Sequence, residues 1–396
     1  MFNFGHMPAN PPRPILPLIV LAQFCCTSIW FAPNAVAEKM LASYDIAGNT
    51  LQDITSAVQF GFIIGTLLFA ILCLADRFSP SRLFFFSALA GAGLNAMLLW
   101  EGNTLSSLLI LRFLTGITLA GVYPVGMKIA ADYYERGLGR TLGYLVGALV
   151  LGTAFPHFLS AFGSSMTWQS VVYTTTFLST LGGIGIVTLV PDGPYRRPAA
   201  RVNLKAAFNA FKNSTFRKVA FGYFGHMWEL YTFWAFVPWM ILFYNSSQGA
   251  HINVPLWSFL IIGIGSVSCA SAGLISLRVG TLRVAKLSLG ISMLCCLASP
   301  AAFLLPSAPL FLLFMMVWGA VVVSDSPLFS TSLAKNSPPE IIGSALTVVN
   351  GLGYALTIIS LQGSAWLMTI IPEQYALFGL GLGPLLGLWS LAKIGR

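Results

Sequence analysis

Residues 105–130 read LSSLLILRFLTGITLAGVYPVGMKIA, and only two of these side chains, Arg112 and Lys128, carry a charge. A helix rises 1.5 Å per residue, so about 20 mostly apolar residues cross the roughly 30 Å of hydrocarbon in a membrane. Membrane-spanning strands are about ten residues long and alternate apolar with polar side chains, unlike this run. The run therefore predicts a transmembrane helix.

Similar runs recur along the whole chain, of which 56% is hydrophobic and only 8% charged, against about a quarter charged in soluble domains. Because lipid offers the backbone no hydrogen-bond partner, such runs must be helical. We therefore predict an all-α membrane protein with twelve transmembrane helices, the first of them retained because no small-x-small cleavage pattern follows it. The expected spans are 15–35, 55–74, 83–100, 105–130, 142–162, 171–190, 219–244, 256–277, 285–305, 309–331, 345–368 and 375–391.

The basic residues predict the orientation of these helices. If the N-terminus is cytoplasmic, all but two of the 21 lysines and arginines fall on the cytoplasmic side or in its short loops. The exceptions are Lys39, in the first outer loop, and Arg112, inside a span. An even number of spans returns the C-terminus to the cytoplasm, as expected of a multi-pass protein of a bacterial-type inner (plasma) membrane. The net charge of +9 therefore reflects topology and does not imply nucleic-acid binding.

The chain divides into two related halves. A hydrophilic stretch, residues 191–218, separates an N-terminal bundle of six helices (1–190) from a C-terminal one (219–396), and its basic residues predict a cytoplasmic linker. Residues 76–82 match 277–283 at a shift of 201, and the fourth and tenth spans match at a shift of 203, which takes Gly116 to Gly319 and Pro124 to Pro327. Duplicated halves are typical of secondary carriers that alternate access around a central site.

The loop after the second span carries Asp76, Arg77 and Arg82 around a Ser-Pro turn. This stretch resembles the signature between helices two and three of the major facilitator superfamily. The resemblance implies a charge-based latch between the halves, so these residues are candidates for a cytoplasmic gate; the positive-inside rule alone would explain the arginines but not the aspartate. The second copy keeps the basic and glycine positions but has leucine for the aspartate: Arg278, Gly280, Arg283 and Leu277.

Two further patterns resemble this family. Arg112 lies in the fourth span, where family members carry an arginine often connected with proton coupling; an arginine in hydrocarbon is costly unless it faces a cavity or an acid, although it could also extend to the outer surface. The fifth span has Gly143, Gly152 and Pro156 in partial agreement with the family's antiporter motif. Close helix packing explains these small residues equally well.

Ionisable side chains in the second half are the strongest candidates for coupling. Glu229 lies about ten residues into the seventh span, where a bare carboxylate is expensive and a proton carrier is expected. His226 precedes it by three residues on nearly the same face, so the two could share a proton or hold a polar substrate group. Asp325 lies in the tenth span, and Arg112 or Lys128 could face it. Each side chain could instead bond only to a neighbouring helix.

Polar and aromatic residues in the first, fourth and seventh spans are candidates for lining a central cavity. In the first span, Gln23, Trp30 and Asn34 follow steps of three and four residues along one stripe of the helix. The remaining candidates are Tyr123, Lys128, Trp228 and Tyr231. Ordinary packing accounts for most aromatic side chains in membranes, so each of these positions has a structural alternative.

We conclude from the sequence that this is a secondary transporter that moves a small polar solute by alternating access, driven by protons. A proton-driven multidrug exporter and a non-transporting sensor on a carrier scaffold are the alternatives. No Gly-rich phosphate loop and no metal-binding His or Cys spacing is present, so we expect neither an enzyme nor a metal or other cofactor. The six cysteines lie in predicted spans, which makes disulfides unexpected, and two six-helix halves need no partner, so we expect a monomer.

Overall fold

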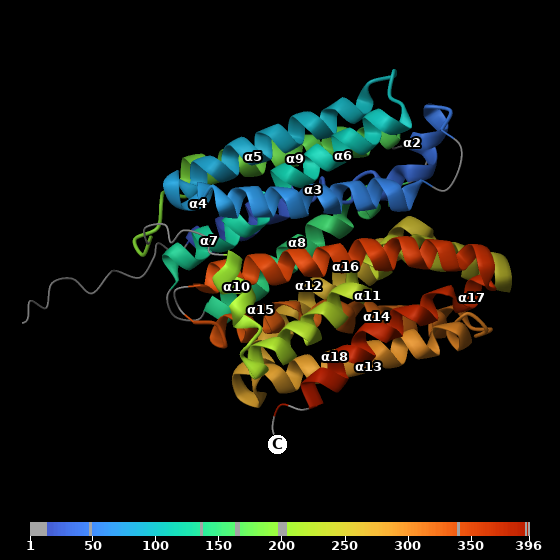
Figure 1. Ribbon diagram of the computed structural model, residues 1–396. Helices are drawn as coiled ribbons and strands as arrows, with labels where there is room; N and C mark the ends of the chain where they lie inside the picture. The colour runs from blue at the N-terminus through green and yellow to red at the C-terminus, as the bar shows by residue number, and fades with distance from the viewer. Residues whose placement is uncertain are drawn as a thin grey trace, which may run out of the picture.

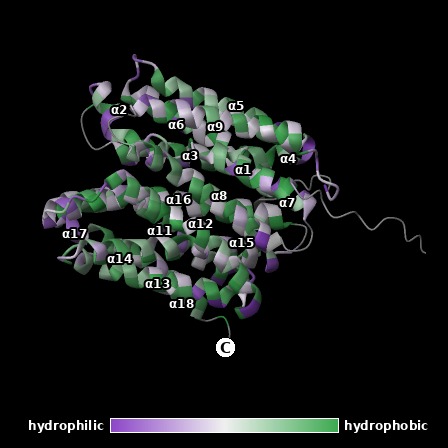
Figure 2. Cartoon of the chain, turned by 180° about the vertical axis from the view of Figure 1, so that it is seen from behind, coloured by the Kyte–Doolittle hydropathy of each residue, from purple (hydrophilic) through white to green (hydrophobic). Residues whose placement is uncertain are grey.

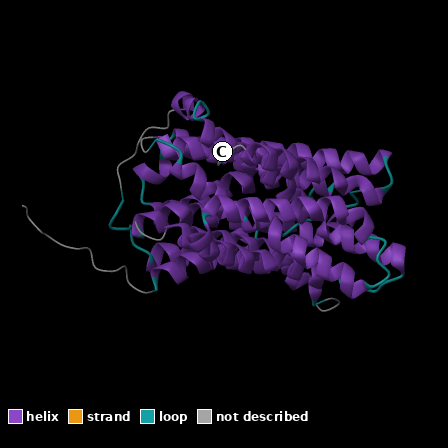
Figure 3. Ribbon diagram, turned by 90° about the horizontal axis from the view of Figure 1, so that it is seen from below, coloured by secondary structure: helices purple, strands orange, loops and turns teal. Residues whose placement is uncertain are grey.

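The computed structural model describes residues 14–46, 50–134, 138–162, 167–196, 204–338, 341–392 and 394. Within these ranges the secondary structure is entirely helical, as Figure 3 shows. Some basic residues that define the predicted orientation lie outside the described residues, namely Arg13, Arg136, Arg197, Arg201, Lys393 and Arg396.

The helices that precede the linker lie together on one side of the molecule in Figure 1. The long ones are α1 (Ile15–Thr27), α3 (Leu51–Ile71), α5 (Pro80–Ala96), α6 (Leu105–Ala120), α7 (Tyr123–Tyr133), α8 (Leu138–Ala161) and α9 (Trp168–Leu189). The short ones are η1 (Asn34–Val36), α2 (Ala37–Ser43), α4 (Leu74–Arg77) and η2 (Met97–Leu99).

The later helices form a second group beside the first in the same view. They are α10 (Leu204–Ala210), α11 (Ser214–Gln248), α12 (Val254–Val279), α13 (Thr281–Ala302), α14 (Ala308–Ser324), α15 (Ser326–Lys335), α16 (Ile342–Ile370), α17 (Glu373–Ala376), η5 (Leu377–Gly381) and α18 (Leu382–Ala392). The two groups touch chiefly where α8 packs on α12 and α3 packs on α16.

Ten helices in the described part of the chain are long and apolar enough to cross a membrane. Figure 2 shows hydrophilic residues gathered at the two ends of the helices, with apolar residues between them. The first predicted span is a 13-residue apolar helix, α1, and α11 is 35 residues long but is not among the ten. The all-helical membrane fold is thus confirmed, whereas twelve spans and cytoplasmic termini stay predictions.

The first, fourth and tenth predicted spans are broken, contrary to the expectation of continuous helices, and the twelfth passes from α17 through η5 into α18. The first run ends as a helix at Thr27, and the fourth and tenth are interrupted between α6 and α7 and between α14 and α15. A proline follows each break, at Pro33, Pro124 and Pro327, and proline removes the N–H that would bond to the carbonyl four residues earlier. Proline is well suited to the first turn of the helix that restarts, which is where the last two stand.

The internal repeat reappears as matching close contacts between helices. A Cβ atom on Gly116 would lie 2.0 Å from the Val58 carbonyl oxygen of α3, and one on Gly319 would lie 2.0 Å from the Ile261 carbonyl oxygen of α12. The shift between 116 and 319 and that between 58 and 261 are both 203. Only glycine permits backbones to approach so closely, and thus the two halves use the same packing device.

Candidate functional site

Glu229 is held inside the second half by donors from two other helices. Its side chain is 1% exposed, and its Oε1 accepts hydrogen bonds from Ser292 Oγ at 2.5 Å and Trp318 Nε1 at 2.6 Å. The Cys296 thiol also donates to this oxygen, at 3.2 Å. Ser292 and Cys296 lie on α13, and Trp318 lies on α14. Donors that converge on one buried carboxyl oxygen stabilise its charged form in a place that otherwise disfavours charge.

His226 and Asp325 form a buried pair one turn away from Glu229. His226 Nδ1 lies 2.8 Å from Asp325 Oδ1, and each side chain is 1% exposed. His226 belongs to α11, whereas Asp325 occupies the break between α14 and α15. The sequence left open a shared proton between His226 and Glu229, but in the structure the acid beside His226 is Asp325. The site therefore contains a carboxylate in a hydrogen-bond network and a separate acid–imidazole pair, and both can bind a proton.

Arg112 holds the break in the first span. Its side chain is fully buried, Nη1 donates to the Ile29 carbonyl at 3.1 Å, and Nη2 donates to the Trp30 carbonyl. The Ile29 carbonyl would normally accept from the residue four positions later, but that residue is Pro33, which has no N–H. Arg112 thus replaces a missing helical hydrogen bond and places a cation at a helix C-terminus, and it does not contact Asp325 as the sequence allowed.

An aromatic cluster joins the two halves beside this break. The Trp30 ring packs on Phe62 of α3, with 4.8 Å between centroids, and lies nearly parallel to Tyr231 of α11 and Tyr354 of α16, at 5.9 and 6.1 Å. Tyr231 and Tyr354 share a hydrogen bond of 2.7 Å between their hydroxyls. Rings from both halves therefore meet where α1 is unwound.

A small internal cavity of about 40 Å³ lies next to the cluster, between the halves. Tyr123 and Tyr231, two of the predicted cavity residues, are among its lining side chains. It also has polar contributors that the sequence did not single out, namely Thr66, Ser326, Ser330 and Asn350. A water molecule needs at least roughly 10–15 Å³ of such space, so the cavity is large enough for water but not for an organic solute.

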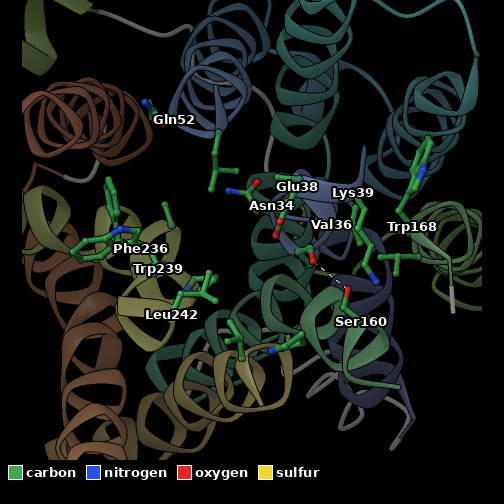
Figure 4. Close-up of a pocket in the computed structure, with 18 of the residues that line it drawn as sticks. Asn34, Val36, Glu38, Lys39, Gln52, Ser160, Trp168, Phe236, Trp239 and Leu242 are labelled. Atoms are coloured by element: carbon green, nitrogen blue, oxygen red, sulfur yellow. Dashed lines mark hydrogen bonds between the residues drawn. The ribbon is translucent and has the colours of Figure 1, made fainter. Parts of the chain in front are cut away.

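A larger cavity of about 370 Å³ lies at the predicted outer side of the membrane, and we call it the outer vestibule (Figure 4). Both halves line it: Asn34 and Trp168 belong to the first, and Phe236 and Trp239 to the second. In Figure 4, Trp168 and Trp239 lie on opposite sides with Asn34 between them. Its volume falls in the range of small-molecule pockets. The halves are thus apart on the predicted outer side and closely packed around the cavity further in.

Four of the predicted cavity residues line neither cavity. Trp228 turns to α18 and η5, where its Nε1 donates to the Gly379 carbonyl at 3.2 Å. Gln23 packs against α7, since a Cβ on Gly126 would lie 2.3 Å from Gln23 Oε1. Lys128 forms ion pairs at the helix ends instead of facing Asp325 or a substrate. Trp30 lies between the two cavities, in the aromatic cluster, and lines neither of them.

The predicted cytoplasmic gate is a cluster within the first half. Lys128 Nζ lies 2.8 Å from Asp76 Oδ1 and 3.6 Å from Asp132 Oδ1. Arg196 Nη2 donates to the carbonyls of Asp76 and Phe78, at 2.9 and 2.7 Å. These contacts join α4, α7 and the start of the linker, so among the described residues the acid of the predicted latch is paired inside its own half. The other gate candidates lie in the same two turns, with the side chains of Arg77, Arg82, Arg278 and Arg283 exposed and Gly280 ending α12 at a φ of 100°.

The sequence missed the partners of Glu229, because Ser292, Cys296 and Trp318 lie 63 to 89 residues away along the chain. It also missed Gln59, Trp234 and Tyr354, which lie near the break in the first span. The available signal was weak: Gln59 is the only amide side chain in its predicted span, and Trp318 lies next to Gly319 of the repeat.

Fold and site together define a helical membrane protein of two related halves, with buried ionisable side chains inside the second half. The sequence profile of the Major Facilitator Superfamily matches residues 19–361, and the chain belongs to this superfamily of transporters. It is therefore not an enzyme.

Two curated relatives are similar over part of their length. NiaP of Bacillus subtilis, provisionally named a niacin/nicotinamide transporter, is 27% identical over 164 residues, which is 40% of this chain and 39% of NiaP. The pantothenate transporter liz1 of Schizosaccharomyces pombe is 26% identical over 200 residues, which is 48% of this chain and 38% of liz1. The similar region thus spans about two fifths of each relative.

Solved transporters share the fold over nearly the whole chain. The nucleoside transporter NupG superimposes with a TM-score of 0.72 at 13% identity, covering 96% of this chain and all of NupG. The human organic anion transporter MFSD10 gives a TM-score of 0.71, also at 13% identity, covering 97% of this chain and all of its own. At this identity the likeness concerns the fold alone.

Proposed function

We propose that this protein imports a small polar solute across the inner membrane by alternating access and couples the movement to protons. The observation that carries the proposal is the pair of buried acids, Glu229 and Asp325, on or beside α11. Ionisable groups inside a membrane protein are costly and mark ion or substrate pathways. Here one acid is held by three donors and the other by His226, so each can exchange a proton as its surroundings change.

The shape of the two cavities supports alternating access. The outer vestibule reaches in from the predicted outer side, and the inner cavity is nearly closed by the aromatic cluster. In a rocking carrier this arrangement corresponds to an outward-facing state that is ready to receive a solute. The relatives named for niacin, nicotinamide and pantothenate favour an organic solute of the size of a vitamin. The halves contact one another along α8–α12 and α3–α16, consistent with a carrier that works as a monomer.

The test uses purified protein in proteoliposomes with an imposed inward proton gradient and labelled nicotinate, nicotinamide or pantothenate. We expect uptake of at least one solute that is driven by the gradient and removed by a protonophore. Glu229→Gln should abolish the dependence on the gradient, whereas Glu373→Gln, a change at an exposed acid, should not. Gradient-driven uptake that survives Glu229→Gln at every pH would contradict the role of Glu229.

The efflux alternative is tested in cells. A multidrug exporter should raise resistance to several unrelated cationic compounds, and an importer should not. Broad resistance that depends on Asp325 would replace the import proposal with efflux. Complete absence of flux in oriented vesicles, with solute binding preserved, would favour the sensor.

A further inference from the structure

Unpartnered polar side chains gather at the break in the first span. Buried polar atoms in proteins are almost always hydrogen-bonded. Among the described residues, four fully buried side chains near this break nevertheless have nitrogen atoms without a partner: Trp30 Nε1, Gln59 Nε2, Arg112 Nε and Trp234 Nε1. Such a group of unsatisfied donors calls for an occupant.

A series of contacts links these four side chains. Arg112 bonds to the carbonyl of Trp30. The Trp30 ring packs on Phe62, which lies one turn after Gln59 on α3, and faces Tyr231, whose ring is 5.1 Å from that of Trp234. We call this group of four side chains the break site. It lies on the path between the cavities, because Asn34 of the outer vestibule bonds to Thr55, one turn before Gln59.

The donors define the polar end of a ligand. An indole nitrogen and a guanidinium nitrogen can only donate, so the occupant must present acceptors to them, whereas Gln59, whose Oε1 also lacks a partner, can both donate and accept. None of the ion pairs formed by the described residues involves Arg112, and its positive charge is therefore balanced only by carbonyl dipoles. A carboxylate supplies two acceptor oxygens and the missing negative charge, and its hydrogen bonds to these donors are charge-assisted.

The rings define the other end of the ligand. Trp30 lies at 28° to Tyr231 and at 19° to Tyr354, so the two tyrosines present faces nearly parallel to the indole. Parallel faces favour a flat aromatic ring over a puckered one of the same size. The inner cavity beside them measures only about 40 Å³, which is too small for such a ring. The aromatic cluster must therefore widen when the ring enters.

We infer that the break site binds a flat, single-ring aromatic carboxylate, with its carboxylate on the donors of Gln59, Trp30 and Trp234 and its ring against the tyrosines. This rests on the proposed function, since it names the chemical class of the solute. Arg112 acts as a positioning residue, which holds the unwound turn that carries Trp30 and supplies the balancing charge.

The experiment measures equilibrium binding to the purified, full-length protein by isothermal calorimetry, without any gradient. The probes are nicotinate and benzoate, with cyclohexanecarboxylate as the puckered acid and nicotinamide as the flat neutral compound. We expect the two aromatic acids to bind at least about tenfold more tightly than either comparison compound, as expected for one charge-assisted bond or one stacking contact. If cyclohexanecarboxylate bound as tightly as the aromatic acids, the preference for a flat ring would be contradicted. If nicotinamide bound as tightly, the requirement for a negative charge would be contradicted.

Two variants locate the site. Gln59→Leu and Trp234→Phe should each weaken nicotinate binding about tenfold by deleting one donor to a charged group. The matched controls are Gln169→Leu on α9 and Trp366→Phe, an exposed residue of α16, which should bind normally. If Gln59→Leu strongly lowers the thermal midpoint, its loss of binding could reflect misfolding, and the test then depends on nicotinate binding to Trp234→Phe alone. Unchanged binding in both variants would overturn the site.

Failure of this inference differs from failure of the proposed function. Aromatic acids that bind but are never moved by a proton gradient would sink proton-coupled import and leave the break site standing. Gradient-driven uptake of pantothenate, which has no ring, together with no binding of nicotinate or benzoate, would support proton-coupled import and contradict the break site.

Discussion

The breaks in the fourth and tenth helices have the same backbone but different chemistry. Both interrupt a long helix four or five residues after a close glycine contact, and both precede a proline at the second position of the restarted helix. The shift of 203 residues takes Val122 of the first break to Asp325 of the second. Both side chains are 1% exposed. The same buried position is thus apolar in one half and acidic in the other.

The neighbours of the two breaks differ in the same way. The shift that relates Val122 to Asp325 also takes Gln23 to His226. The Gln23 amide, packed against α7, has no hydrogen-bond partner among the described residues, whereas His226 lies 2.8 Å from Asp325. The two halves therefore share the backbone of the break, but only the second half has an acid–imidazole pair at this position. The first half contributes its charge elsewhere, through Arg112 at the break in α1.

The largest expected effect comes from giving the second break the residues of the first. Asp325→Val leaves His226 buried without its acid, and breaking such a pair costs roughly 3–5 kcal/mol of folding free energy. The double variant His226→Gln with Asp325→Val should be more stable than the single one, since no half of a pair is left behind. Both should lose gradient-driven uptake.

Scanning fluorimetry gives the stabilities and vesicle uptake gives the transport. The conservative control is Val122→Ile, which keeps the first break apolar and should retain uptake. Uptake by the double variant that still follows the proton gradient would show that the pair is dispensable, and the difference between the two breaks would then be structural only.

A smaller effect tests the part that the halves share. Gly116→Ala and Gly319→Ala each place a Cβ against a backbone carbonyl of the neighbouring helix, and overpacking of this kind costs about 1–3 kcal/mol. The two variants should lower the thermal midpoint by similar amounts. Gly185→Ala and Gly363→Ala are the controls, because nothing lies within 4 Å of a Cβ at either position. A strong effect at only one of Gly116 and Gly319 would show that the contact is not equivalent in the two halves.

The comparison also marks what the sequence could predict. Runs of apolar residues, the repeat and the ionisable residues within spans were visible, because each depends on residue type and spacing along one helix. The partners of Glu229 and the choice of Asp325 by His226 were not, since they depend on how α11, α13 and α14 rotate about their axes. In a membrane, the face toward lipid is as apolar as the face toward protein, so periodicity reveals this rotation poorly. Pro33 indicated that the first span is broken. The residue that stabilises this break, Arg112, lies 83 residues from Ile29 along the chain, so the sequence did not reveal it.

The smallest effect is expected at the cytoplasmic turns, where the two copies differ as well. Asp76 pairs with Lys128 at 2.8 Å, whereas Leu277, which occupies the equivalent position, is 73% exposed. Both members of the pair are about a quarter exposed, and exposed pairs contribute only about 0.2–1 kcal/mol, less at high salt. Lys128→Gln should therefore lower the thermal midpoint slightly in low salt and less in high salt, and Arg278→Gln in the second copy should do neither. A loss of uptake in Lys128→Gln with unchanged stability would show that this cluster governs movement of the halves, even though its contacts lie within one of them.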